Sequence, residues 1–105
     1  MKIKIKKYKK VQSTNDIALK LIKQNVSEPT LITTETQTKG RGRVGKKWIS
    51  KNGNLFISLL FKYDPKKINF KQFAILNAFL VKNVISKITL KRIKIKWPND
   101  LLFNE

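Results

Sequence analysis

The chain contains no cysteine and no histidine among its 105 residues. Without cysteine it forms no disulfide and offers no thiolate ligand to a metal. Without histidine it lacks the side chain most often used as a general base and metal ligand near neutral pH. Any catalysis by these residues must therefore come from positioning, from fixed charge and from a few carboxylates.

Long apolar runs are also missing. No stretch approaches the roughly 20 apolar residues that a membrane-spanning helix requires, and the first residues lack the apolar segment of a secretory signal. We therefore expect a soluble, cytoplasmic protein without a membrane partner. With 41% hydrophobic residues, the chain can fill a modest core and is not a disordered tail.

Acidic residues are scarce: 6 Asp and Glu stand against 24 Lys and Arg, which gives a formal net charge of +18. This balance is typical of proteins that bind nucleic acid or other polyanions. It also fits a lysine-rich background composition that has no function. The arginines carry more information, because only three occur and two of them, Arg41 and Arg43, stand beside glycines in one loop.

Hydrophobic periodicity predicts an α+β protein, close to the α/β class, in which helices flank a mixed sheet. Strands are expected at residues 2–6, 30–35, 55–61, 92–97 and 101–103, and helices from Ser13 to near Asn25 and from Asn69 to about Lys87. Ser13 is expected to cap the first helix. The stripe that should face the core on this helix consists of Ile17, Ala18, Leu21 and Ile22.

The strand patterns also predict burial. Lysine and isoleucine alternate at residues 2–6, which predicts a strand with one buried face. The near-continuous apolar run at residues 55–61 predicts a central strand that is covered on both faces. Trp97 shares a face with Ile93 and Ile95, so we expect it in the core.

The most distinctive segment is a loop at residues 37–48, Gln-Thr-Lys-Gly-Arg-Gly-Arg-Val-Gly-Lys-Lys-Trp. Its glycines allow positive φ and a close approach of ligand to backbone. Arg41 and Arg43 offer planar sets of donors that pair with carboxylate or phosphate oxygens, and Trp48 offers a flat face that can cover a ring. We expect this loop to close over an anionic small molecule; a solvated basic loop is the plain alternative.

Two shorter segments accompany the loop. Residues 13–15, Ser-Thr-Asn, open the first helix, and residues 96–100, Lys-Trp-Pro-Asn-Asp, close a strand. The first segment can be a plain helix cap, and the second a plain hairpin turn. Pro98 fixes φ and ends strand pairing, so the amide and carboxylate that follow it are free to turn inward.

Together these three segments closely resemble the first half of the catalytic domain of biotin protein ligases, also named biotin–[acetyl-CoA carboxylase] ligases. The resemblance runs from about Val11 to Glu105 and depends on the combination of the segments. It implies the fold of the biotin/lipoate ligase catalytic domain, which is similar to class II aminoacyl-tRNA synthetases. Residues 1–105 would then be a truncated N-terminal portion of that domain, with no DNA-binding domain and no C-terminal β domain.

The resemblance also implies roles for the matching residues. Arg41 and Arg43 would be catalytic. Biotin would contact Ser13, Thr14, Asn15, Gln37, Gly40, Arg41, Gly42 and Arg43. The nucleotide would contact Arg43, Trp48, Lys96, Asn99 and Asp100. Trp48 is equally consistent with a hydrophobic anchor at a strand edge, and no residue is assigned to a metal site.

The implied reaction uses biotin, ATP and Mg²⁺. Biotin is activated to biotinyl-5′-AMP with release of pyrophosphate, and a lysine of the biotin carboxyl carrier protein, the acetyl-CoA carboxylase subunit, then accepts the biotinyl group. Fixed cations suit the first step, because two anions must be held together. No specific DNA binding is expected.

The chain also departs from the family pattern. A lysine that follows the Asn-Asp motif in the family would fall beyond Glu105, so we expect a fragment that is inactive alone. The Arg-Arg-x-Ser-Gly-Gly-Gly motif of the related lipoate ligases is absent. Two other interpretations stay open: a small basic nucleic-acid-binding module, and a non-functional remnant of a ligase.

Overall fold

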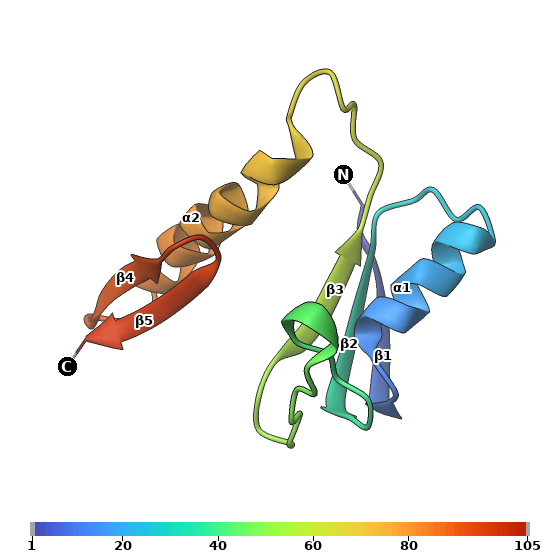
Figure 1. Ribbon diagram of the computed structural model, residues 1–105, viewed down its shortest axis with the longest axis horizontal. Coiled ribbons are helices and arrows are strands. Elements are labelled where there is room, and N and C mark those ends of the chain that lie inside the picture. Colours follow the sequence, from blue (N-terminus) through green and yellow to red (C-terminus); the bar gives the residue numbers. More distant parts are fainter. Residues whose placement is uncertain (1, 105) are drawn as a thin grey trace. The chain divides into compact units, whose positions relative to one another are not determined.

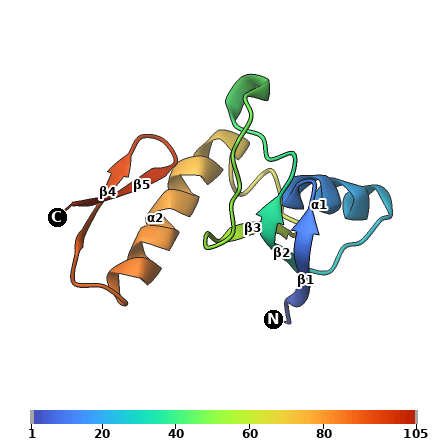
Figure 2. The ribbon, with the colours of Figure 1, turned by 90° about the horizontal axis from the view of Figure 1, so that it is seen from below.

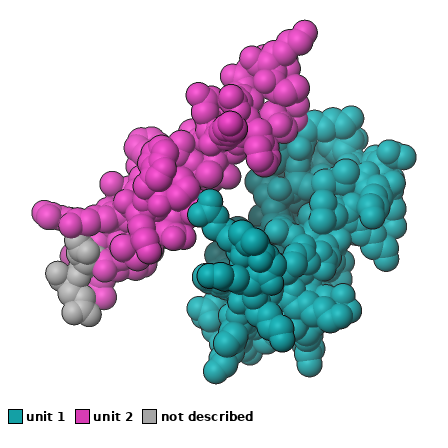
Figure 3. Space-filling model, in the orientation of Figure 1, with its two compact units in different colours: residues 1–62 teal, residues 63–105 magenta. Residues whose placement is uncertain are grey.

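The computed structural model describes residues 2–104. The elements in chain order are β1 (Lys4–Val11), α1 (Thr14–Lys23), β2 (Thr30–Gln37), β3 (Phe56–Leu60), α2 (Phe73–Ser86), β4 (Arg92–Lys96) and β5 (Asp100–Asn104) (Figure 1). They form two compact units, Met1–Lys62 and Tyr63–Glu105 (Figure 3). The predicted α+β class is confirmed, and every expected helix and strand is present.

The first unit is a mixed sheet with the strand order β1-β2-β3. β1 is parallel to β2, and β2 is antiparallel to β3. Parallel neighbours cannot be joined by a tight turn and need a crossover connection, which α1 provides. This helix lies along one face of the sheet (Figures 1 and 2), so its N-terminus is held near the ends of the strands that it connects.

The core of this unit lies between α1 and the sheet. Ile32 on β2 is fully buried and packs with Ala18 and Leu21 of the helix and Leu60 of β3. Ile22 was expected on the same helical stripe, but this is wrong, because its side chain is 54% exposed. It follows Leu21 by one residue, a rotation of about 100° that carries it past the edge of the buried face.

Two expectations about the sheet are also wrong. Within the described residues β3 lies at an edge of the sheet, and its Ile57 and Leu59 are 48% and 47% exposed. Ile3 and Ile5 near the other edge are 47% and 55% exposed. The register aligns Ile5 with Leu31 and Leu31 with Leu59, so these side chains share the face opposite to α1, which this helix leaves uncovered.

The second unit contains α2 and the antiparallel hairpin of β4 and β5. Asn69 caps a short 3₁₀ turn that leads into α2, and Ala78 and Ile93 are its buried apolar residues. Trp97 was expected in the core but is 75% exposed, because it begins the turn between β4 and β5 and does not continue the strand. In residues 2–104 no helix is long and apolar enough to cross a membrane.

Candidate functional site

The first turn of α1 carries three of the predicted site residues. The Ser13 hydroxyl oxygen accepts a hydrogen bond from the Asp16 N–H at 3.4 Å, so the capping role is confirmed. Ser13 and Thr14 are buried, whereas Asn15 is exposed. The helix start therefore presents one exposed amide side chain beside two packed hydroxyl groups.

A relay of hydrogen bonds connects this turn to the neighbouring strands. The Thr14 N–H donates to Gln37 Oε1 at 2.9 Å, and the Thr14 hydroxyl lies 2.8 Å from the Ser58 hydroxyl. Ser58 donates to Asn15 Oδ1 at 2.5 Å, and Gln37 Nε2 donates to Ser50 Oγ at 3.0 Å. Segments that lie far apart in the sequence thus hold Thr14, Asn15 and Gln37 in one place.

The glycine-rich segment is a hairpin with a hydrogen-bonded base and an exposed tip. At the base the Trp48 N–H donates to the Gly40 carbonyl at 2.8 Å, and the Gly42 N–H donates to the Lys46 carbonyl at 2.6 Å. The tip is a short 3₁₀ turn, Arg43–Gly45, with no buried residue. The base is therefore preorganised, and the tip has few contacts to hold it.

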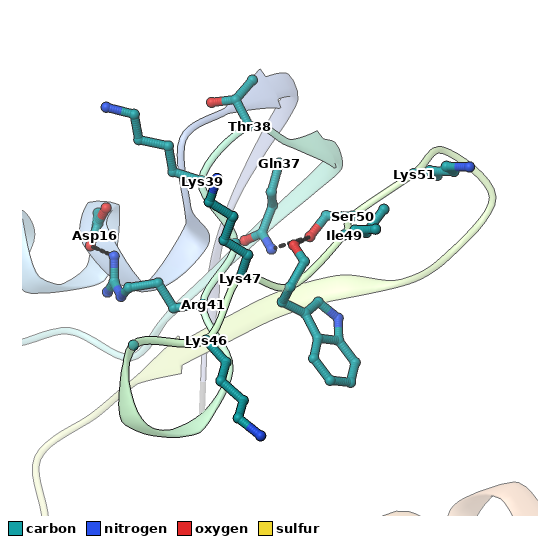
Figure 4. A pocket seen from close by; sticks show the side chains of 13 residues that line it. Asp16, Gln37, Thr38, Lys39, Arg41, Lys46, Lys47, Ile49, Ser50 and Lys51 are labelled. Carbon is teal, nitrogen blue, oxygen red and sulfur yellow. Dashed lines mark hydrogen bonds and ion pairs between the residues drawn. The ribbon is translucent and has the colours of Figure 1, made fainter.

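The two predicted catalytic arginines lie in different surroundings. Arg41 points to the first turn of α1, where its Nη1 lies 2.6 Å from Asp16 Oδ1 (Figure 4). Both side chains are more than one third exposed, so this ion pair contributes little to stability, but it ties the loop to the helix. Arg43 stands at the exposed tip of the loop and lines neither of the two cavities described next.

Two cavities adjoin at the base of the loop, and Gln37, Arg41 and Trp48 line both. The larger has a volume of about 690 Å³ and is drawn in Figure 4. Its lining includes five cations, Lys39, Arg41, Lys46, Lys47 and Lys51, and one carboxylate, Asp16. Because that carboxylate pairs with Arg41, the four lysines leave the larger cavity positively charged, as an anionic ligand requires.

The smaller cavity has a volume of about 240 Å³ and is chemically different. Its lining combines polar residues of the relay with three apolar residues of the β3 region: Thr14, Asn15, Gln37 and Ser58, and Leu55, Phe56 and Ile57. A few polar groups on an apolar surface are typical of a site that orients a small, mostly neutral ligand.

The remaining predicted residues fall into two places. Trp48 is 61% exposed, and its ring would lie 3.6 Å from a Cβ placed at Gly42. Lys96, Asn99 and Asp100 belong to the second unit, where all three are exposed at the end of the β4–β5 hairpin. Lys96 and Asp100 are opposite each other in that hairpin, so the predicted hairpin turn is confirmed.

The sequence alone did not identify three members of the site: Asp16, Ser50 and Ser58. Ser58 left one signal, because it is the single polar residue in the apolar run of β3. Asp16 follows the predicted cap residue Ser13 by three positions and donates its N–H to it. Its carboxylate instead binds an arginine that lies 25 residues further along the chain.

The chain resembles proteins of known activity. Residues 8–105 match the family model described as Biotin/lipoate A/B protein ligase family. The bifunctional ligase/repressor BirA of Bacillus spizizenii is 36% identical over 95 residues, which cover 90% of this chain and 29% of that protein. A biotin–[acetyl-CoA-carboxylase] ligase of Paracoccus denitrificans is 30% identical over 97 residues, which cover 90% of this chain and 40% of that protein.

Two solved structures are also similar to this chain. The biotin protein ligase of Aquifex aeolicus in complex with biotin and ATP has 36% identity and a TM-score of 0.79, over 97% of this chain and 42% of that chain. The biotin acetyl coenzyme A carboxylase synthetase of Helicobacter pylori, with bound biotinylated ATP, has 28% identity and a TM-score of 0.85, over 96% and 49%. The chain spans less than half the length of each of these four proteins. The resemblance and the fold predicted from the sequence are thus confirmed, and the chain belongs to the biotin/lipoate A/B protein ligase family.

Proposed function

We propose that the protein that carries this chain is a biotin protein ligase. It activates biotin with Mg-ATP and transfers the biotinyl group to a lysine of a biotin carboxyl carrier protein, the acetyl-CoA carboxylase subunit. The observation that supports this most is the junction of a neutral polar cavity with a cation-lined cavity at Gln37, Arg41 and Trp48. A ligand with a neutral ring at one end and an anion at the other matches that junction.

The smaller cavity would hold the ring system of biotin. Ser13, Thr14, Asn15 and Gln37 line it and offer hydroxyl and amide groups, which orient a small heterocycle by a few hydrogen bonds. The backbone at Gly40 and Gly42 would complete the biotin site, since glycine lets a ligand come close to the main chain.

The larger cavity would hold the reacting anions. A carboxylate oxygen of biotin attacks the α-phosphorus of ATP, a new P–O bond forms, and the bond to pyrophosphate breaks. Arg41 has one donor on Asp16, which leaves further guanidinium N–H groups for a carboxylate or phosphate. Arg43 would join from the tip when the loop closes, and the closed loop would protect the mixed anhydride from water.

The nucleotide would also contact Trp48, Lys96, Asn99 and Asp100. The indole ring of Trp48 is largely exposed and is therefore available to cover a ring. Magnesium would enter as Mg-ATP, with phosphate oxygens among its ligands. Among residues 2–104 no group of three or more His, Cys, Asp or Glu side chains is placed to hold a metal ion.

In the second step the amine of the carrier lysine attacks the acyl carbon of biotinyl-5′-AMP. An amide bond forms, the bond to AMP breaks, and the amine loses a proton. The 105-residue chain alone is expected to be inactive, because it spans less than half of the length of its relatives.

The test is replacement of both loop arginines in the full-length protein. Arg41→Gln with Arg43→Gln should lower biotin-dependent ATP–pyrophosphate exchange by about 100-fold or more, the loss typical for removal of groups that stabilise transition-state charge. The matched control is Lys20→Gln with Lys23→Gln, which removes two cations from the exposed side of α1 and should leave exchange unchanged. Undiminished exchange in the arginine variant, or exchange with lipoate and not biotin, would contradict the proposal.

The net charge of +18 favours one other candidate, a basic nucleic-acid-binding module. Such a module would lose DNA or RNA affinity steeply as salt rises and would not respond to biotin. A biotin ligase would bind these polymers only weakly and would bind biotin at physiological salt. Measuring both affinities across a salt series distinguishes the two functions.

A further inference from the structure

Ser58 occupies the centre of the hydrogen-bond relay. It is the single polar residue of β3, its side chain is directed to the α1 side of the sheet, and it is only 9% exposed. Its hydroxyl contacts Thr14 and Asn15, two residues that precede it by more than 40 positions. We propose that Ser58 is a positioning residue that holds the Asn15 amide with its N–H groups directed to the smaller cavity.

A count of protons sets the direction of the relay. Ser58 has one hydroxyl proton, and Asn15 Oδ1 can only accept, so that proton goes to Asn15. The Thr14 hydroxyl must then donate to Ser58 across their 2.8 Å separation. Gln37 Oε1 already accepts from the Thr14 N–H at 2.9 Å, so it needs no proton from the Thr14 hydroxyl, which lies further away at 3.3 Å.

The separation between Ser58 and Asn15 favours this direction over the opposite one. If the Asn15 amide were turned, its Nδ2 would donate to Ser58, and Ser58 would donate to Thr14. The separation of 2.5 Å between Ser58 and Asn15 lies in the range of O–H···O bonds and is too short for N–H···O bonds, which lie near 2.9 Å. The amide oxygen therefore faces Ser58, and the amide nitrogen faces away from it.

The amide nitrogen of Asn15 has no partner among residues 2–104. Because Asn15 lines the smaller cavity and is exposed, its two N–H donors are available to a ligand. A donor pair there selects a ligand that presents an acceptor. This inference rests on the proposed function, in which that acceptor is the carbonyl oxygen of the biotin ureido ring.

The test compares biotin with 2-iminobiotin, in which an N–H group replaces the carbonyl oxygen, by calorimetric titration of the full-length protein. The wild type should bind biotin more tightly than 2-iminobiotin. Ser58→Ala releases the amide, which can then turn its oxygen to the ligand. The Kd for 2-iminobiotin divided by the Kd for biotin should therefore fall about tenfold, the effect of about one hydrogen bond. Ser58→Thr retains the hydroxyl and should restore the ratio.

Two further variants complete the test. Ser27→Ala removes an exposed hydroxyl outside the relay and should keep the wild-type ratio. If Ser58→Ala does not fold, Asn15→Asp removes the donors without changing the shape of the side chain and should lower the ratio in the same way. A wild-type ratio in Ser58→Ala and Asn15→Asp, or a wild-type preference for 2-iminobiotin, would overturn the inference alone. A wild type that binds neither ligand would overturn the proposed function and the inference with it.

Discussion

Gly40 is the position at which the backbone of the loop comes closest to its surroundings. A Cβ at this residue would lie 2.5 Å from Ser50 Oγ and 2.6 Å from the Trp48 carbonyl oxygen. The carbonyl belongs to the backbone and accepts from Ser50, so it cannot simply rotate away. Glycine is needed here for space, because any side chain would push the two strands of the loop base apart.

Gly40→Ala should therefore lower the free energy of unfolding by about 1–3 kcal/mol, the usual cost of overpacking, and should weaken biotin binding. Urea unfolding followed by circular dichroism measures the first effect. Gly42→Ala is the matched control for stability, since a Cβ at Gly42 would find its nearest neighbour at 3.5 Å, an ordinary contact. Equal unfolding midpoints for the two variants would show that the loop base is looser than the structure indicates.

Val44 at the tip of the loop carries backbone strain. Its φ is +54°, in the left-handed region that a β-branched residue rarely adopts, and its side chain is fully exposed. Asparagine tolerates this region, so Val44→Asn should raise the free energy of unfolding by about 1 kcal/mol. Ile49→Asn, which replaces another exposed apolar residue of the loop without positive φ, should give no gain; a gain of the same size there would mean that exposure and not φ is responsible.

The sequence predicted the contacts of residues that are neighbours in the chain. The Ser13 cap joins atoms three residues apart and follows from local preference alone. Ser58 and Asn15 are 43 residues apart, and their contact depends on the register of β2 against β3, which no local pattern encodes. The same reason explains why the partner of Arg41 was missed, although the arginine itself was identified.

At the scale of elements, the loop between β2 and β3 has a hydrogen-bonded base and a tip with few contacts. At the base, hydrogen bonds join Gly40 to Trp48 and Gln37 to Ser50. The turn at Arg43–Gly45 has no buried residue and holds strained backbone. A segment of this kind closes over a ligand by movement of the tip about a fixed base.

Hydrogen exchange of the full-length protein should distinguish the base of the loop from its tip by the protection of their amides. The Trp48 amide should be protected with and without ligand, because it is bonded to Gly40. The amides of Val44 and Gly45, which lie in the tip that has no buried residue, should exchange rapidly in the free protein and slow by at least about tenfold with biotin and Mg-ATP. Tip amides that are equally protected in both states would refute closure of the loop.

The presence of each element followed from the sequence, but its exact bounds and its neighbours did not. The strand predicted at residues 30–35 extends to Gln37, and the helix predicted from Asn69 begins with a 3₁₀ turn. The apolar run at residues 55–61 was assigned to the centre of a sheet, whereas β3 is an edge strand of the described sheet. Apolar content shows that a strand can be covered, and only the arrangement of other elements decides whether it is.

At the scale of the whole molecule, each unit leaves apolar side chains uncovered. In the first unit Ile5, Ile57 and Leu59 are about half exposed on the sheet face opposite to α1. In the second unit Phe79 and Val84 of α2 are 51% and 59% exposed. Contiguous apolar surface of this kind is uncommon on monomeric proteins and promotes association.

The isolated 105-residue chain should therefore self-associate and bind an apolar dye such as ANS. Ile57→Thr with Leu59→Thr should reduce both the dye fluorescence and the sedimentation coefficient, because threonine keeps the strand preference and removes apolar surface from the open face. Leu60→Thr on the same strand is the control: this residue is 7% exposed and packs under α1, so its loss should cost about 2 kcal/mol of stability or more and should not reduce dye binding. If the double variant binds as much dye as the wild type, the open face of the sheet is not the surface that drives association.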